Sequence, residues 1–117
     1  MLVADDDDMF AGALLAFLER DERIELIGRA RNGDEAAEMA HSLQAGLVLM
    51  DIQMPILNGI EAAKQILARR PKTHIFMLTG WDDEDYADAA LSAGVVTLIE
   101  KGNVLDELPA AIAKLHV

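Results

Sequence analysis

Five polar residues stand at or just beyond the ends of short apolar runs in this chain, and their chemical types suit one site. They are Asp5, Asp6, Asp51, Thr79 and Lys101. A short, continuously apolar run is typical of a strand buried on both faces of a parallel sheet. The carboxyl ends of such strands meet at one edge, where α/β proteins place their functional crevice. The spacing therefore predicts that these five side chains converge.

Three carboxylates packed together would repel one another, and a hard divalent cation is the simplest remedy. Mg²⁺ prefers carboxylate and carbonyl oxygens and uses few protein ligands. The Lys101 ammonium and the Thr79 hydroxyl would be donors for an incoming oxyanion. This combination indicates phosphoryl transfer onto a carboxylate, with the cation and Lys101 offsetting the charge of the transferred group.

The apolar runs predict five strands that alternate with five helices. The third run ends at Asp51, because Pro55 cannot extend a central strand and Asn58-Gly59 is a turn signal. Alternation with short connections predicts right-handed crossovers and a parallel α/β sheet. The strands are expected at residues 1–4, 24–28, 47–50, 74–78 and 95–99.

Helical spacing of apolar residues places a helix after each strand. Asp7 or Asp8 is expected to cap the first helix, since a carboxylate accepts from free first-turn N–H groups. Gly94 suits the end of the fourth helix. Pro109 disfavours an early start of the last helix, because proline deep in a helix removes a hydrogen bond. The first helix is expected to end near residue 20, the next three to span 34–42, 60–69 and 84–93, and the last to start near residues 105–106.

The composition fits one domain of 117 residues that occupies the whole chain, with no second domain. The chain has no cysteine, which excludes disulfides, thiol nucleophiles and thiolate metal sites. No run approaches the roughly 18 apolar residues of a membrane span, and no secretory signal is visible. A cytoplasmic location without membrane contact is therefore expected. A net charge of −11 disfavours direct binding of nucleic acid.

Three motifs stand at the predicted strand ends in an order found in one family. They are Ala4-Asp5-Asp6, the block 48–55 (Val-Leu-Met-Asp-Ile-Gln-Met-Pro) and the turn 58–61 (Asn-Gly-Ile-Glu). With them, the whole chain resembles the receiver domain of bacterial two-component response regulators, and it looks closest to receivers that precede a LuxR-type helix-turn-helix. The resemblance implies a flavodoxin-like α/β fold, a doubly wound five-stranded parallel sheet of order 2-1-3-4-5 with five helices.

The resemblance also implies a phosphoacceptor and a metal site. Asp51 corresponds to the residue that accepts the phosphoryl group in such receivers. Asp6 corresponds to a direct Mg²⁺ ligand, and Asp5 to a ligand that acts mainly through water. The backbone carbonyl of Gln53 would be the third protein ligand, beside Asp51 itself.

Other positions matched by the resemblance would contact or border the phosphoryl group. Thr79 would hydrogen-bond one phosphoryl oxygen and move towards it on activation, and Lys101 would pair with another. Gln53 and Trp81 occupy positions that tune how quickly water removes the group. For Trp81, packing within its loop is an equally simple interpretation.

The chain departs from the family pattern at three places. Leu98 stands where an aromatic residue often swings inward as the threonine moves. Gly102 follows Lys101 where many receivers have a proline with a cis bond, which leaves open whether that bond geometry is kept. Asp7 and Asp8 add negative charge near the metal site, where they would either tighten it, raise a neighbouring pKa, or act as a solvated helix cap.

The function implied is a phosphorylation-dependent signalling switch without an enzymatic activity beyond its own phosphorylation and dephosphorylation. A sensor histidine kinase, docking beside Met9 and Ala13, or a small phosphodonor would supply the phosphoryl group. Phosphorylation would change the surface between residues 84 and 101, with a homodimer as one possible result. The output would be transcription, through a DNA-binding domain outside this chain, whether the chain is a fragment or stands alone. The acidic residues between 82 and 88 are a solvated helix face in the simplest interpretation, and a surface for a basic partner in another.

Two alternatives belong to other classes of protein. A pseudo-receiver would keep the fold and bind partners without phosphorylation, and Leu98 and Gly102 leave this open. A haloacid-dehalogenase-like phosphatase would need a second aspartate two residues after the nucleophile. Gln53 stands there, so the chain does not fit that class.

Overall fold

Five parallel strands form one sheet in the order β2-β1-β3-β4-β5. The structure is a computed structural model, and it describes residues 1–80 and 83–115. The predicted order is confirmed, and it places the change of winding direction between β1 and β3, where open α/β sheets form their crevice. The strands are β1 (Leu2–Ala4), β2 (Gly28–Ala30), β3 (Leu47–Asp51), β4 (His74–Thr79) and β5 (Thr97–Glu100).

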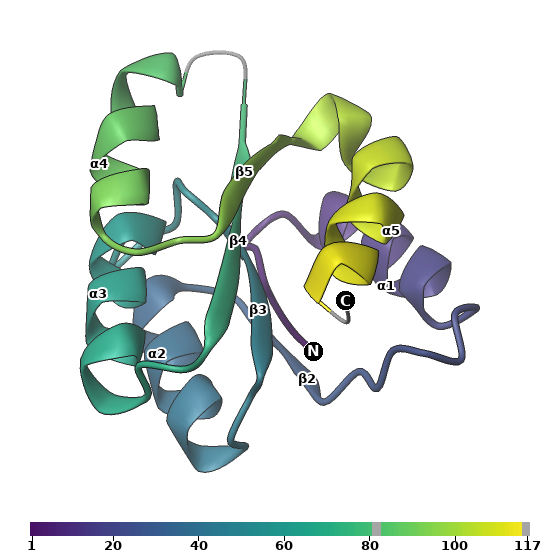
Figure 1. Ribbon diagram of the computed structural model, residues 1–117, viewed down its shortest axis with the longest axis horizontal. Helices are drawn as coiled ribbons and strands as arrows, with labels where there is room; N and C mark the ends of the chain where they lie inside the picture. The colour runs from purple at the N-terminus through teal and green to yellow at the C-terminus, as the bar shows by residue number, and fades with distance from the viewer. Residues whose placement is uncertain (81–82, 116–117) are drawn as a thin grey trace.

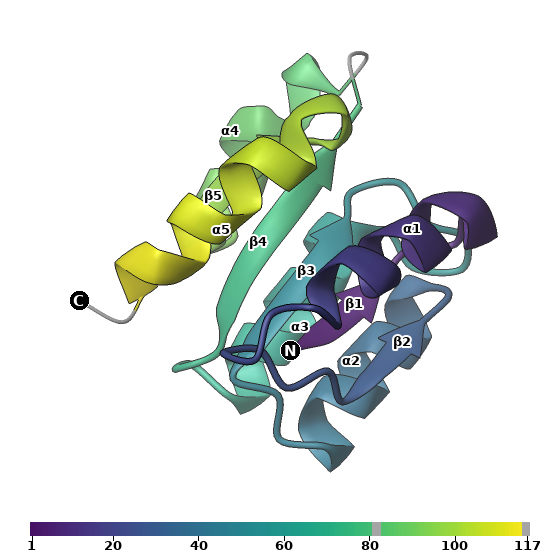
Figure 2. The ribbon, with the colours of Figure 1, turned by 90° about the vertical axis from the view of Figure 1, so that its right-hand side faces the viewer.

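The helices cover both faces of the sheet (Figure 1). Helices α2, α3 and α4 lie on one face, and α1 and α5 lie on the other, where Figure 2 shows them in front of the strands. In the described ranges the helices are α1 (Asp8–Leu18), α2 (Gly33–Ser42), α3 (Gly59–Arg69), α4 (Ala87–Ser92) and α5 (Val104–Leu115). Two short 3₁₀ turns, η1 (Glu84–Tyr86) and η2 (Lys101–Asn103), precede α4 and α5.

Alternation along the strands divides the core into two layers. In β3, Val48 and Met50 pack beneath α2 and α3, whereas Leu49 packs beneath α1 and α5. The same alternation occurs in β4, where Ile75 and Met77 face one layer and Phe76 faces the other. A strand buried on both faces reads as a continuous apolar run, which is why the sequence showed no polar alternation here.

The second strand lies later in the chain than the sequence predicts. The apolar segment 24–28 was expected to be β2, but only its last residue, Gly28, belongs to the strand. β1 offers three residues for pairing, and Leu2 pairs with Gly28. The preceding residues are not in a strand, although Ile24 and Leu26 pack on the α1–α5 core layer and the Ile27 N–H donates to the Met1 carbonyl at 3.0 Å.

The segment around α4 also differs from the prediction of one helix over 84–93. Its first turn is 3₁₀, α4 ends at Ser92, and neither helix start has a side-chain cap. Gly94 ends the helix as predicted, with φ +105°. The Val95 N–H then donates to the Ala90 carbonyl at 3.4 Å, so its backbone completes the helix end and β5 starts at Thr97 instead of Val95.

Helix α5 starts at Val104 and contains Pro109, which the sequence placed closer to the helix start. The helix tolerates the proline because Val104, Leu108 and Ile112 are buried in the core on one side. The carbonyl of Leu105 loses its helical donor, but Leu105 is half exposed, so water can replace the bond.

Within the described residues, no helix is both long and apolar enough to cross a lipid bilayer.

Candidate functional site

The two acidic strand ends lie side by side because of strand register. Ala4 of β1 pairs with Met50 of β3, so the next residues, Asp5 and Asp51, stand opposite one another. Side chains alternate between faces, and both carboxylates therefore point to the side covered by α1 and α5. Asp5 is fully buried and Asp51 is 5% exposed. Ionisable groups buried this deeply require partners.

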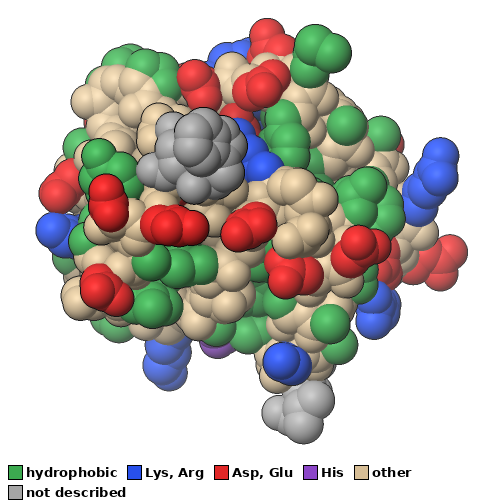
Figure 3. Space-filling model, turned by 90° about the horizontal axis from the view of Figure 1, so that it is seen from above, with side chains coloured by type: hydrophobic (Ala, Val, Ile, Leu, Met, Phe, Trp, Pro, Cys, Tyr) green, Lys and Arg blue, Asp and Glu red, His purple; other side chains and the backbone are tan. Residues whose placement is uncertain are grey.

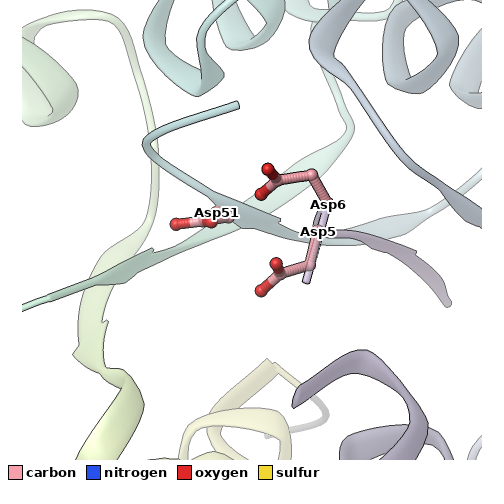
Figure 4. A group of neighbouring side chains, drawn as sticks. All are labelled: Asp5, Asp6 and Asp51. Atoms are coloured by element: carbon pink, nitrogen blue, oxygen red, sulfur yellow. The ribbon is translucent and has the colours of Figure 1, made fainter. Parts of the chain in front are cut away.

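Asp6 completes a group of three carboxylates. One oxygen from each of Asp5, Asp6 and Asp51 lies within 4.8 Å of the others. Figure 4 shows the three side chains at the neighbouring ends of β1 and β3, with Asp6 on the exposed side. Figure 3, which looks onto this end of the molecule, shows further acidic side chains around it. The predicted convergence of these three residues is confirmed.

Among the described residues, Lys101 is the cation that forms ion pairs with this group of carboxylates. Its ammonium lies 3.0 Å from Asp5 Oδ2 and 3.1 Å from Asp51 Oδ2. The aromatic ring of Phe10 on α1 covers it from the other side, 4.6 Å from the ring centroid. The ammonium is thus held by two carboxylates and a cation–π contact. Lys101 joins the site as the sequence predicted.

The surroundings change the ionisation of both partners. Burial, followed by the charge of Asp5, raises the pKa of Asp51 from its ordinary 3.8 to about 6, although Lys101 acts in the opposite direction. Burial acts to lower the pKa of Lys101, but its close contacts with Asp5 and Asp51 and their negative charges outweigh burial, so the pKa of Lys101 is raised. Near neutral pH, Asp51 is therefore mainly ionised beside the Lys101 ammonium.

The donor set fits a hard divalent cation. Asp5 Oδ2 is buried and accepts no hydrogen bond, although the Lys101 ammonium forms an ion pair with it at 3.0 Å. Asp6 supplies an exposed carboxylate beside it, and Asp51 a third. Carboxylate oxygens clustered at this separation are the ligands that Mg²⁺ selects. The residues present therefore fit such an ion.

The turn after Asp51 is held by close backbone packing. Gly59 begins α3 against β3, and a Cβ there would clash with the Asp51 carbonyl oxygen. The Gly59 N–H donates to the Ile52 carbonyl at 2.8 Å. Asn58 caps α3 by accepting from Glu61 N–H at 2.9 Å. The turn signal in the sequence thus corresponds to a rigid support for Asp51.

Gln53 lies in this turn and connects two loops. Its backbone N–H donates to Asp51 Oδ1 at 3.4 Å. Its side-chain amide donates to the carboxylate of Asp83, from the loop after β4. The other oxygen of Asp83 accepts from the Gly80 N–H at 2.6 Å. The role of the Gln53 backbone carbonyl as a metal ligand stays a prediction.

Thr79 ends β4 next to β3. Asp51 pairs with Leu78, so Thr79 stands one residue beyond the level of Asp51 on the neighbouring strand, and it is 8% exposed. Thr79, Asp83 and Leu98 line a cavity of about 360 Å³ between α4 and β5. Leu98, which stands where an aromatic residue was expected from the resemblance, therefore borders this cavity together with Thr79.

Asp7 and Asp8 have local structural partners. Asp7 caps α1, accepting from Met9 N–H at 3.0 Å and Phe10 N–H at 3.2 Å. Asp8 forms an ion pair of 2.7 Å with Arg29, which also donates to the Asp5 carbonyl. The predicted cap is confirmed, and among the described residues neither carboxylate belongs to the acidic group.

Two sequence features remain, the peptide bond after Lys101 and the position of Trp81. The peptide bond between Lys101 and Gly102 is trans, as are all others in the described ranges. Trp81 was expected beside the phosphoryl group, but it lies outside the described residues.

Two contacts at the site were missed by the sequence interpretation. Asp83 was grouped with the solvated acids of its segment, yet it is buried. Phe10 was not named as a site residue, yet its ring covers Lys101. The special role of Asp83 could have been suspected because it precedes a helix start at Glu84, but the neighbouring acids gave the same signal. The contact between Phe10 and Lys101 had no signal in the sequence.

Comparison with known proteins agrees with this geometry. Residues 1–113 match the family model described as the response regulator receiver domain. The transcriptional regulatory protein LnrK of Bacillus subtilis is 34% identical over 116 residues, which cover 99% of this chain and 53% of LnrK. The chain therefore spans about half the length of that relative.

Two solved structures share the fold. The response regulator domain of Thermotoga maritima CheB matches with a TM-score of 0.88 and 31% identity, covering 97% of this chain and 92% of that one. A DNA-binding response regulator of the LuxR family from Staphylococcus aureus matches with a TM-score of 0.90 and 22% identity, covering 99% and 97%. The second likeness concerns the fold alone.

The parallel sheet of order 2-1-3-4-5, with an acidic group at the carboxyl ends of β1 and β3, defines the class of flavodoxin-like α/β domains. Within that class, the family match is specific. The chain belongs to the response regulator receiver domain family of two-component systems.

Proposed function

We propose that this chain is, over its full length, a receiver domain that switches its surface when Asp51 is phosphorylated. The observation that carries the proposal is a nearly buried carboxylate, held by Lys101 at 3.1 Å and grouped with two further carboxylates. Family membership supports the class of reaction. The chain is not proposed to act on any external substrate.

Asp51 is the nucleophile in this proposal. One of its carboxylate oxygens attacks phosphorus, the bond from phosphorus to the donor nitrogen or oxygen breaks, and the leaving group keeps the electron pair. Asp51 must be ionised, and its pKa of about 6 leaves it mainly ionised near neutral pH. Hydrolysis reverses the state, since water attacks phosphorus and the Asp51 carboxylate leaves with the electrons.

The neighbouring residues hold charge and geometry. Asp5, Asp6, Asp51 and the Gln53 carbonyl would hold Mg²⁺, which when bound offsets negative charge on the transferred group. Lys101 would leave its ion pair with Asp51 and hold a phosphoryl oxygen.

Thr79 would donate its hydroxyl to another phosphoryl oxygen. Movement of Thr79 towards the group would change the neighbouring cavity lined by Leu98, and with it the surface formed by α4, β5 and α5.

The partners follow from the exposed surface beside the site. Met9 on α1 is 87% exposed next to the acidic group, and a sensor histidine kinase is proposed to dock there, beside Ala13. The output is proposed to be transcription through a DNA-binding domain outside this chain, in the cytoplasm, with or without a homodimer. Met9→Glu should slow transfer from a kinase while leaving phosphorylation by acetyl phosphate unchanged.

The test is intact mass after incubation with acetyl phosphate, with and without Mg²⁺. One added phosphoryl group that requires both Mg²⁺ and Asp51 is the expected result. Asp51→Asn should remain unmodified, while Asp85→Asn, which changes an exposed carboxylate of η1, should behave as the native chain. No adduct under any condition would contradict the proposal. Because Leu98 replaces the frequent aromatic residue, that result would favour a pseudo-receiver that binds partners without phosphorylation.

A further inference from the structure

The carboxylate of Asp83 has an unusual environment for an acid in an acidic loop. It is 3% exposed, although its neighbours Glu84 and Asp85 are exposed. It stands at the start of η1 but does not cap that turn. It accepts instead from the Gly80 N–H at 2.6 Å and from the Gln53 side-chain amide. In residues 1–80 and 83–115, no lysine or arginine forms an ion pair with it.

These two donors flank the proposed phosphoacceptor. Gln53 is two residues beyond Asp51, and its backbone N–H already reaches Asp51 Oδ1. Gly80 follows Thr79 at the end of β4, the strand whose Leu78 pairs with Asp51. A group attached to Asp51 at the sheet edge would therefore enter the region between the segments that Asp83 connects.

We propose that Asp83 is a positioning residue that competes with the phosphoryl group on Asp51 for the Gly80 and Gln53 donors. This inference rests on the proposed phosphorylation of Asp51. In the unphosphorylated chain, Asp83 keeps the two loops connected. On phosphorylation it must release them, so its hydrogen bonds stabilise the unphosphorylated state.

The competition follows from the chemistry of the two anions. A phosphoryl group adds about −1.5 to −2 charges and three strong acceptor oxygens. A single N–H serves one strong acceptor well, and hydrogen bonds to charged groups are shorter and stronger than neutral ones. Asp83 is buried without a cation, so it depends on these donors more than an exposed carboxylate would. The incoming charge also repels it.

The expected effect of removing this competitor is tighter binding of a phosphoryl mimic. Asp83→Asn keeps the side-chain size but has no charge and only one acceptor oxygen. Loss of one charge-assisted hydrogen bond from the unphosphorylated state should raise the affinity for beryllium fluoride with Mg²⁺ about tenfold. Asp85→Asn is the matched control, because it removes the same charge from an exposed neighbour.

The experiment measures beryllium fluoride affinity together with the amide proton shift of Gly80 by NMR. In the native chain without metal, the short bond to Asp83 should place the Gly80 proton downfield. Mg²⁺ alone should leave it there, and beryllium fluoride should move it. Asp83→Asn should lose the downfield shift at the outset and bind the mimic more tightly, while Asp85→Asn matches the native chain in both respects.

The outcomes separate the two proposals. If the native chain binds beryllium fluoride but Asp83→Asn binds it no more tightly than Asp85→Asn, the competition is wrong and Asp51 phosphorylation stands. An unmoved Gly80 proton in the native chain overturns the competition even if Asp83→Asn does not fold. If the native chain neither binds the mimic nor takes up a phosphoryl group, the proposed function is wrong and the competition with it.

Discussion

Replacing Asp51 by asparagine should stabilise the folded chain in the absence of divalent cations. Burial and the charge of Asp5 disfavour the ionised form of Asp51 and raise its pKa to about 6. Asparagine has nearly the same shape without the charge. Lys101 does not lose all its partners in Asp51→Asn, because Asp5 Oδ2 remains 3.0 Å away.

The magnitude follows from the two pKa values of Asp51. The folded value of about 6 exceeds the ordinary 3.8 by about two, and each pKa unit corresponds to about 1.36 kcal/mol, which gives about 3 kcal/mol as an upper bound. The side chain lies at the mouth of the sheet, where solvent screens part of the effect. We therefore expect Asp51→Asn to raise the free energy of unfolding by about 1–2 kcal/mol at neutral pH.

The pH dependence has a definite sign. A carboxyl group with a raised pKa binds protons more tightly in the folded chain, so its ionisation costs stability. The cost is absent below the ordinary pKa of 3.8, grows as the pH rises towards 6, and is complete above it. The gain from Asp51→Asn should therefore be small near pH 4 and largest above about pH 7.

The assay is urea unfolding of the native chain and Asp51→Asn, with a chelator, at several pH values between about 4 and 8. Asp85→Asn serves as the control for simple loss of negative charge. Added Mg²⁺ should stabilise the native chain more than Asp51→Asn at high pH and close the gap. A variant that is no more stable than the native chain above pH 7, or a gain independent of pH, would refute the electrostatic reasoning.

Three further predictions concern backbone strain, the Lys101 contact and the core. Ile56 has φ +71° and is 81% exposed, so Ile56→Gly should raise the free energy of unfolding in urea by about 0.5–1 kcal/mol. Gln44, at a helix end, has φ +53°, and Gln44→Gly should give a similar gain. Phe10→Leu removes the ring over the ammonium and should lower both the pKa of Lys101, measured by NMR, and the stability by about 0.5–1 kcal/mol. Leu108→Ala empties a fully buried position of α5 and should cost about 2–5 kcal/mol in urea unfolding.

The pairing of Asp5 with Asp51 could be predicted from the sequence because it depends on simple geometry. Each follows a short apolar run, and parallel strands bring their carboxyl ends to one edge. The observed register, with Ala4 opposite Met50, makes the two residues neighbours on the same face. Strand ends and side-chain alternation are local properties, so the apolar pattern was sufficient.

The boundaries of β2 and β5 could not be predicted in the same way, because apolar content does not report backbone pairing. Ile24 and Val95 both pack on the core without belonging to a strand. For Val95 the backbone N–H is used by the end of α4. Apolar content does not show whether an N–H is used by the preceding helix or by the neighbouring strand.

The buried state of Asp83 was hidden for a related reason. Acids in the same segment carry the same local signal, and Asp83 differs from them by its contacts with Gly80 and with Gln53, thirty residues earlier. Burial of a single acid among several depends on a partner from another strand end. No local pattern in the chain contains that information.

The stability cost of Asp51 gives the proposed switch its driving force. A ligand can shift a conformational equilibrium only by the difference in its affinity for the two states. Here the carboxylates of Asp5 and Asp51 destabilise each other, and Asp5 Oδ2 lacks a hydrogen bond. A divalent cation would relieve that repulsion locally. A phosphoryl group on Asp51 would instead demand new donors, and two donors of the flanking loops are held by Asp83. Phosphorylation would therefore act on the loop after β4 through competition for hydrogen bonds, in addition to any direct pull on Thr79.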